Sequence, residues 1–169
     1  MSKTDLCFLT VAEAGRLFRR REVSPVEVVR ALLERIEALN GRLNIYITVL
    51  AEGALQQAQE AEEDFRRGER LGPLHGIPVG LKDLFYTRGV RTTGGSKVLA
   101  DFVPQEDATA VARLREAGAV FLGKLNLHEF AYGVTNDNPH YGPAHNPWDP
   151  QRIPGGSSPG HGGTHDPHG

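Results

Sequence analysis

A helical pattern that leads directly into an apolar strand constrains the fold of this 169-residue chain more than any other feature. Asp107 can cap a helix over Ala108–Ala117. Gly118 is placed to end that helix, because glycine readily adopts the left-handed conformation found at helix ends. Val120–Leu122 follows almost at once, with the apolar character of a buried strand. A helix that feeds into a buried strand is the unit that builds largely parallel sheets, so we expect an α/β fold.

The rest of the chain predicts several more helices and further strands. Thr10 and Glu13 have the spacing of a capping box, and the helix that they begin is expected to end near Arg21. Ser24 and Pro25 provide a cap and a first-turn proline for the next helix. The remaining expectations are helices over Val26–Asn40 (stopped by Gly41), Ala51–Arg67 (closed by Gly68) and Leu127–Tyr132, a strand over Ile77–Leu81, and a strand or helix lead-in over Asn44–Val49.

Charge and composition argue against several classes of partner. The formal net charge of −2 gives no strong electrostatic basis for binding nucleic acid or an anionic membrane. No apolar run approaches the ~20 residues needed to span a bilayer, and the N-terminal residues lack a signal-peptide pattern. The single cysteine, Cys7, cannot form an internal disulfide, which fits a reducing compartment. These features predict a cytoplasmic protein.

Two residues are candidates for catalysis. Lys82 lies in the apolar segment Gly76–Phe85, where burial would disfavour its charged form and let it serve as a base. Ser157 lies in the turn Pro154–Ser158, where glycines let the backbone approach a substrate and a hydroxyl can relay a proton. Each feature also has an ordinary explanation, because most lysines are exposed and most glycine–serine clusters are loops. From these residues alone, both interpretations stay open.

Five motifs in a fixed order carry a family resemblance. They are Pro-Leu-His-Gly-Ile-Pro-Val-Gly-Leu-Lys-Asp at 73–83, Thr-Thr-Gly-Gly-Ser at 92–96, Gly-Lys-Leu-Asn-Leu-His-Glu-Phe-Ala-Tyr-Gly at 123–133, Tyr-Gly-Pro-Ala-His-Asn-Pro-Trp-Asp at 141–149 and Pro-Gly-Gly-Ser-Ser at 154–158. With these motifs the chain resembles the N-terminal part of the amidase signature family over residues 8–158. The resemblance implies an α/β fold with a mixed sheet covered by helices, of which this chain supplies the N-terminal helices and the first strands.

The resemblance also implies a Ser–Ser–Lys triad that hydrolyses a carboxamide C–N bond, with no cofactor and no metal. Lys82 matches the base of this triad. Ser157 matches the bridging serine, which the family holds after a cis peptide bond and which passes a proton between the nucleophilic serine and the lysine. The nucleophile attacks the amide carbonyl, ammonia or an amine leaves, and water hydrolyses the acyl-enzyme. Tyr132 and Gly133 match a loop beside the substrate.

After Ser158 the sequence departs from the family pattern. The family continues with glycines and an alanine-rich helix, followed by the nucleophile and the oxyanion hole, whereas this chain continues with glycine, proline and histidine. We expect residues 1–158 to be the N-terminal part of a single amidase domain and residues 159–169 to be an aberrant tail from a frame shift or truncation. The expected result is an inactive chain with exposed apolar faces. A less favoured interpretation is a metal site in the tail, formed by His161, His165 and His168 with Asp166.

Two functions within the family fit the chain. A stand-alone amidase is favoured by Asn126–Asn138, because the amidotransferase pattern usually has Met-Asp-Glu-Phe-Ala-Met-Gly followed by serine-rich residues. The alternative is a fragment of the glutaminase component of the tRNA-dependent Glu/Asp amidotransferase, which releases ammonia from glutamine for a partner protein. A third possibility is a non-catalytic remnant that binds a partner through an unpaired sheet edge. The expected partners are a small-molecule amide and either a second copy of the chain or the other amidotransferase subunits.

Overall fold

The computed structural model describes residues 1–69 and 71–159, which divide into two compact units. The first unit comprises Met1–Glu37, Leu50–Val79 and Ala112–Leu122. The second unit comprises Ala38–Val49, Gly80–Val111 and the described residues from Gly123 onward. Each unit is therefore assembled from segments that are distant in the sequence.

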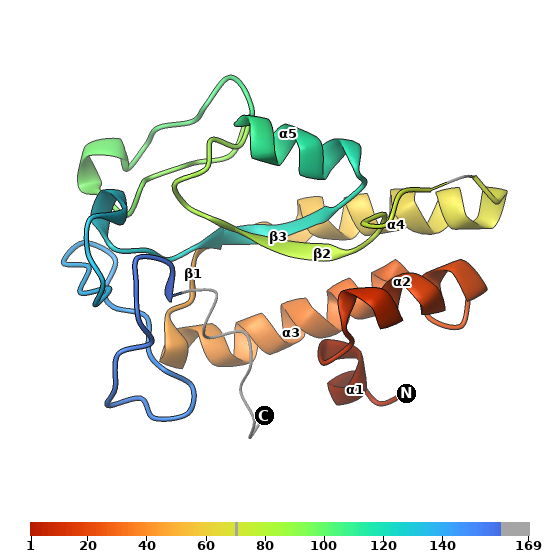
Figure 1. The fold of residues 1–169 in the computed structure, drawn as a ribbon, viewed down its shortest axis with the longest axis horizontal. Helices are drawn as coiled ribbons and strands as arrows, with labels where there is room; N and C mark the ends of the chain where they lie inside the picture. The colour runs from red at the N-terminus through yellow and green to blue at the C-terminus, as the bar shows by residue number, and fades with distance from the viewer. Residues whose placement is uncertain (70, 160–169) are drawn as a thin grey trace. The chain divides into compact units, whose positions relative to one another are not determined.

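Figure 1 shows the helices and strands in chain order along the colour gradient. The helices are α1 Lys3–Cys7, α2 Val11–Arg20, α3 Pro25–Leu43, α4 Ala51–Arg67 and α5 Thr109–Glu116, with single 3₁₀ turns η1 Lys97–Leu99 and η2 Glu129–Ala131. The strands are β1 Tyr46–Val49, β2 Pro78–Lys82 and β3 Val120–Leu125. None of the helices in the described part of the chain has the length and apolar character that crossing a membrane demands.

The sheet is mixed, because its central strand pairs differently with its two neighbours. The strand order is β1-β3-β2, and β1 runs antiparallel to β3 with Tyr46 opposite Leu125. Along β2 and β3, the Val120 N–H donates to the Ile77 carbonyl and the Asp83 N–H donates to the Leu125 carbonyl. These two bonds advance in the same direction along both strands, as in a parallel pair. The α/β class expected from the sequence is confirmed.

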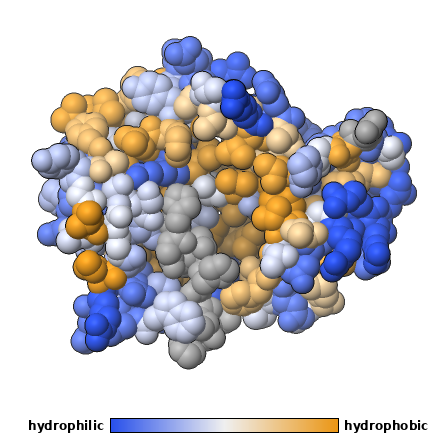
Figure 2. Space-filling view, viewed as in Figure 1, coloured by the Kyte–Doolittle hydropathy of each residue, from blue (hydrophilic) through white to orange (hydrophobic). Residues whose placement is uncertain are grey.

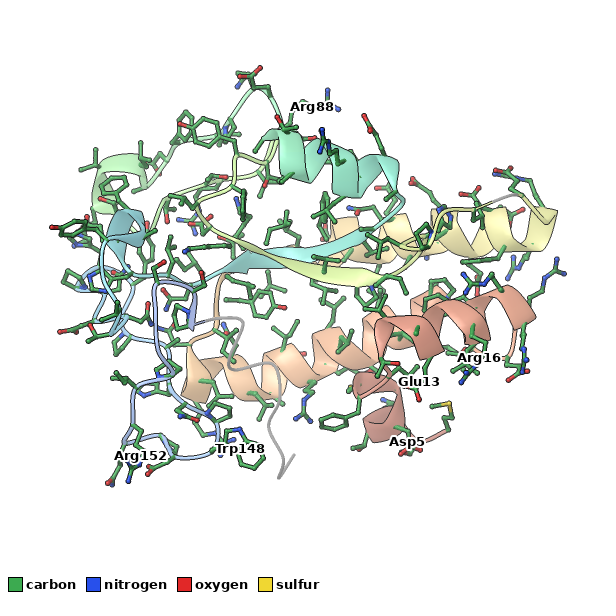
Figure 3. All side chains as sticks on the ribbon, in the orientation of Figure 1. Asp5, Glu13, Arg16, Arg88, Trp148 and Arg152 are labelled. Carbon is green, nitrogen blue, oxygen red and sulfur yellow. The ribbon has the colours of Figure 1, made fainter. Side chains whose placement is uncertain are left out.

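The first unit is held together by apolar contacts of its helices. Thr10 caps α2, and the Glu13 carboxylate reaches back to the Thr10 N–H at 2.9 Å (Figure 3). Phe18 on α2 is 1% exposed, and its ring centroid lies 6.0 Å from that of Phe65 on α4. The buried cluster around Phe18 also contains Ala14, Val23, Val28 and Ile77. Apolar positions at helical spacing thus become the core.

Glycine ends helix α4 as predicted but does not end helix α3. The predicted bounds of α4 are confirmed, because Gly68 takes φ 72 and its N–H bonds back to the last turn. The prediction that Gly41 stops α3 is wrong, since the helix continues through it. The residue after α3 is Asn44, which has φ 51 and donates its side-chain amide to the Tyr141 carbonyl at 2.8 Å. Asparagine tolerates this left-handed conformation. Because its hydrogen-bond partner Tyr141 is distant in the sequence, no local sequence pattern marks this helix end.

The helix predicted over Leu127–Tyr132 is also wrong in its extent, because only the single turn η2 forms. Phe130 and Ala131 have φ 49 and φ 59, a left-handed conformation that such residues seldom adopt. The Phe130 N–H donates to the Gly94 carbonyl at 2.7 Å. A hydrogen bond to a distant segment therefore replaces a local helical bond at this position.

The second unit buries polar and charged side chains in addition to apolar ones. The buried polar and charged side chains of residues 1–69 and 71–159 all belong to it: Asp83, Thr87, Thr92, Thr93, Ser96, Lys124, Asn126, Asn136 and Asn138. Most of the large apolar side chains that are exposed in the described part of the chain belong to this unit as well, among them Val98, Tyr132 and Val134. Figure 2 shows apolar surface on one face of the molecule. Polar groups are thus concentrated inside the unit that contains both candidate catalytic residues.

Candidate active site

The end of β2 brings Lys82 into contact with Ser157. The Lys82 Nζ donates a hydrogen bond to the Ser157 Oγ at 2.7 Å, although the two residues are 75 positions apart in the sequence. Both residues are half-buried. The strand that carries Lys82 is paired with β3, which gives the side chain a rigid support. The two candidate catalytic residues are therefore neighbours in space.

Burial lowers the pKa of Lys82 below the ordinary lysine value, because removal from water disfavours the charged ammonium. A lowered pKa makes the neutral amine available at lower pH than for a lysine in water. The neutral amine can accept the Ser157 hydroxyl proton across the same 2.7 Å contact. The pair is thus able to move a proton between a hydroxyl and an amine.

The segment that follows β3 holds the turn that carries Ser157. The Gly156–Ser157 peptide bond is cis, as the resemblance leads us to expect. The Ser157 carbonyl accepts a hydrogen bond from the His128 N–H at 3.2 Å. A Cβ at Gly156 would lie 2.7 Å from the carbonyl carbon of Val134 and 3.1 Å from the carbonyl oxygen of Gly133. Glycine is required at this position, because the backbone of the following segment packs directly against it.

Tyr132 and Gly133, the two residues expected beside the substrate, lie in that same segment. Gly133 has φ 155, and a Cβ there would lie 2.4 Å from the His128 imidazole. The main chain of Gly133 is thus packed between the His128 ring and the turn that carries Ser157. The Tyr132 side chain is 89% exposed and is accessible to a molecule in solution. Gly133 therefore packs against the turn that carries Ser157, whereas the Tyr132 side chain is exposed.

A buried ion pair next to Lys82 was missed by the sequence interpretation. Asp83 Oδ1 and Lys124 Nζ are 3.3 Å apart, and both side chains are fully buried. Lys124 Nζ also donates to the Thr92 Oγ1 at 2.6 Å and to the Phe85 carbonyl at 2.8 Å. The sequence does contain a clue, because Lys124 is the charged residue in the otherwise uncharged strand β3, all of whose residues are buried. A charge in such a strand indicates a partner, since burying an unpaired charge is very costly.

Buried asparagines are a second feature that sequence patterns missed. Asn138 lies in a stretch that reads as turns, yet its side chain is 1% exposed. Its amide donates to the Gly95 carbonyl at 2.8 Å and to the Leu127 carbonyl at 2.9 Å. These bonds join the glycine-rich loop at 92–96 to the segment after β3. Side chains that bond to the backbone follow no periodic pattern, so their burial leaves no trace in hydrophobic spacing.

Within residues 1–69 and 71–159, no group of three or more His, Cys, Asp or Glu side chains could hold a metal ion. The histidines that offer the alternative metal interpretation, His161, His165 and His168, lie outside the described residues.

Comparison with curated proteins points to an amide-cleaving family. A family model described as Amidase matches residues 27–164. The A subunit of glutamyl-tRNA(Gln) amidotransferase from Geobacter sp. (strain M21) is 53% identical over 152 residues, which cover 90% of this chain and 31% of that relative. The chain spans about a third of the length of the curated relatives that it matches.

Solved structures share the fold across nearly all of the chain. The native peptide amidase from Stenotrophomonas maltophilia matches with a TM-score of 0.84 and 37% identity, over 90% of this chain and 33% of its own. A structure titled as a vestigial protein complex that reveals the origins of an s-triazine catabolic enzyme matches with a TM-score of 0.87 and 40% identity, over 90% and 34% respectively. Together with the family model, these similarities show that the chain belongs to the amidase signature family.

Proposed function

We propose that this chain contributes the proton relay of an amidase catalytic site, with Lys82 as the base and Ser157 as the bridging serine. The observation that carries the proposal is the 2.7 Å contact between Lys82 Nζ and Ser157 Oγ. The lowered pKa of Lys82 and membership of the amidase signature family support it. The substrate class is a carboxamide, whose C–N bond is hydrolysed.

The proposed reaction uses the pair in both of its stages. Neutral Lys82 accepts the Ser157 proton, while Ser157 accepts the proton of a nucleophilic serine whose oxygen attacks the amide carbonyl. The proton returns through the pair to the leaving nitrogen, so that ammonia or an amine departs and an ester to the enzyme remains. Water then gives up a proton to the same relay and attacks the ester carbonyl. The relay returns this proton to the departing serine oxygen, so that a carboxylic acid leaves and the free serine is restored.

The nucleophile of this scheme is expected beyond the described residues. By resemblance it lies about two dozen residues after Ser157, in a glycine-rich turn that also forms the oxyanion hole. We therefore propose that residues 1–158 act as the N-terminal part of an amidase domain and that the 169-residue chain alone has no turnover. Tyr132 and Gly133 would border the substrate in that domain. The packing of the Gly133 backbone against Gly156 supports this role for their segment.

A chimera tests the proposed relay. Residues 1–158 of this chain replace the matching segment of the Geobacter amidotransferase protein, with which it shares 53% identity. We expect hydrolysis of glutamine or of a simple aryl amide, and a fall in kcat of about a hundredfold or more for Lys82→Ala and for Ser157→Ala. Lys97→Ala removes an exposed lysine of the same unit and should leave kcat unchanged.

One result would overturn the proposed relay, and another would refute the proposed inactivity of the chain alone. A folded chimera that keeps full turnover after Lys82→Ala would exclude Lys82 as the base. The intact chain should be assayed against the same two substrates. Turnover by that chain, lost in Lys82→Ala, would keep the relay but refute the proposed inactivity of the chain by itself.

A second candidate function is that of the amidotransferase glutaminase component, which frees ammonia from glutamine for a partner protein. The observation in its favour is the 53% identity to a protein named as part of that amidotransferase, compared with 40% and 37% for two solved amidases. The segment Asn126–Asn138 favours the stand-alone amidase instead, because it lacks the methionine- and serine-rich amidotransferase pattern.

Exchange of that segment within the chimera separates the two candidates. If the chain is a stand-alone amidase, the chimera should prefer the aryl amide and bind the host's partner proteins poorly. Restoring the host residues at 126–138 should then recover glutamine hydrolysis and partner binding. If the chain is an amidotransferase fragment, glutamine hydrolysis and copurification with the partner proteins should be present before the exchange and unchanged after it.

A further inference from the structure

The buried ion pair beside the candidate base has no role in the reaction described above. Asp83 directly follows Lys82 in sequence, and Lys124 lies on the neighbouring strand β3, with 3.3 Å between Asp83 Oδ1 and Lys124 Nζ. Replacing a buried ion pair by well-packed apolar residues is often neutral or even stabilising. Stability alone is therefore a poor explanation for two charges at this place in the fold.

The Lys124 ammonium has two hydrogen-bond acceptors and one carboxylate as its neighbours. Its Nζ contacts the Thr92 Oγ1 at 2.6 Å, the Phe85 carbonyl at 2.8 Å and the Asp83 carboxylate at 3.3 Å. Thr92 and Phe85 accept hydrogen bonds from this ammonium, and the Asp83 carboxylate balances its charge as an ion pair. Lys124 thereby joins β3 to two places beyond the end of β2, at Phe85 and Thr92.

Asp83 is fixed through both its side chain and its backbone. Its Oδ2 accepts from the Thr93 N–H at 2.9 Å and from the Thr93 hydroxyl at 2.5 Å. Its own N–H donates to the Leu125 carbonyl at 2.9 Å, and its carbonyl accepts from the Gly94 N–H at 2.9 Å. The residue that follows Lys82 is thus anchored to β3 on one side and to the loop at 92–96 on the other.

The ion pair also places the Asp83 carboxylate against Lys124 and not against the candidate base Lys82. Asp83 would raise the pKa of a nearby lysine and keep it protonated, which opposes the effect of burial on Lys82. Its carboxylate instead faces the Lys124 ammonium, while the Lys82 side chain contacts Ser157. The two adjacent residues therefore have different partners. Asp83 forms an ion pair with Lys124, whereas Lys82 contacts the hydroxyl with which it can exchange a proton.

We propose that Asp83 and Lys124 are positioning residues for Lys82: the buried pair fixes the end of β2 so that the Lys82 amine stays at the Ser157 hydroxyl. The catalytic meaning of this role rests on the function proposed above. The geometry itself is testable on the intact chain without any turnover. Failure of one proposal is therefore distinguishable from failure of the other.

The test is a titration of Lys82 followed by NMR in the 169-residue chain labelled with ¹³Cε-lysine. The chain contains only four lysines, Lys3, Lys82, Lys97 and Lys124, so each signal can be assigned by substitution. The main variant is Asp83→Asn/Lys124→Met, which removes both charges and leaves neither buried alone. The matched control is Lys3→Met/Glu34→Gln, which removes an exposed ion pair of 2.6 Å in the first unit.

The expected result is a loss of the constraint on Lys82. In the main variant its titration midpoint should rise toward the ~10.4 of an unperturbed lysine. Ser157→Ala should change the Lys82 midpoint in the parent chain but have little further effect in the main variant. The control variant should match the parent chain. A folded main variant with an unchanged Lys82 midpoint and an unchanged response to Ser157→Ala would overturn the proposal.

A milder pair of variants decides the matter if the main variant does not fold. Thr93→Val removes the hydroxyl, which donates to Asp83 and accepts from the Gly95 N–H, but keeps the backbone N–H bond to Asp83. Thr93→Ser keeps all three bonds. We expect Thr93→Val to move the Lys82 midpoint upward by a smaller amount and Thr93→Ser to restore the parent value. A merely structural role would lower the melting temperature of Thr93→Val and leave the Lys82 midpoint where it was, which would refute positioning.

Discussion

The two compact units of this chain differ in what they bury. In the first unit, helices bury apolar side chains such as Phe18 and Val28, whereas the second unit buries charged and polar ones such as Asp83 and Lys124. Apolar burial is favourable without regard to direction, but a buried polar group is tolerated only with a partner at the right distance and angle. Both units bury apolar side chains, but the second adds buried polar contacts whose distances and angles restrict the geometry around Lys82.

Removing one charge from the polar interior should have the largest effect on stability. Lys124→Met leaves Asp83 buried and unpaired, so we expect the free energy of unfolding to fall by about 3–5 kcal/mol. Asp83→Asn/Lys124→Met removes both charges and should cost much less than the single substitution. Urea denaturation of the three proteins measures the difference. An equal loss of unfolding free energy in the single and double variants would contradict the interpretation that Asp83 and Lys124 are buried as an ion pair.

Truncation in the apolar unit should have a smaller effect. Val28 is 2% exposed, so Val28→Ala removes two buried methyl groups and should lower the free energy of unfolding by about 2 kcal/mol. Val98→Ala is the matched control, because Val98 is 82% exposed and its truncation should change stability by less than about 0.5 kcal/mol. Similar losses at both sites, measured by the same denaturation, would mean that the first unit is not stabilised by its core.

Alanine in place of glycine should act in opposite directions in the two units, with the smallest magnitudes. Apart from the backbone of its own helix, the nearest atom to a Cβ at Gly53 on α4 is the Gln57 side-chain nitrogen at 3.9 Å, so Gly53→Ala should stabilise by up to about 1 kcal/mol. Gly133→Ala would put a Cβ 2.4 Å from the His128 ring at φ 155, so it should destabilise by more than about 1 kcal/mol. Thermal melts of the two variants give the signs, and the same sign in both would contradict the contrast.

The fold of the first unit could be predicted well from its sequence because its structure depends on local patterns. The Thr10 and Glu13 capping box marks the start of α2, and Gly68 marks the end of α4. The errors occur where a distant contact decides. Gly41 stays helical, and Phe130 bonds to Gly94 instead of continuing a helix. Hydrophobic spacing contains no information about such contacts.

The candidate site was only partly predictable for the same reason. Lys82 and Ser157 were singled out from motifs, and they do lie 2.7 Å apart, but no spacing rule joins residues 75 positions apart. Asp83 and Lys124 were missed, although both stand inside the motifs that carry the resemblance. Periodicity shows which side chains face inward and is silent on which buried charges pair. A lysine in a strand buried along its whole length was the available clue.

The measurement that matters most is the titration midpoint of Lys82 in the intact chain, because it reports whether the amine is held at the Ser157 hydroxyl. Because Lys82 is partly buried, we expect a midpoint below the ~10.4 of an unperturbed lysine. Because its amine contacts the Ser157 hydroxyl, we expect this midpoint to change on Ser157→Ala. Below its pKa Lys82 is protonated and cannot accept a proton, so turnover of an active chimera should rise with pH through that same midpoint. A midpoint at the unperturbed value, insensitive to Ser157→Ala, would contradict the account.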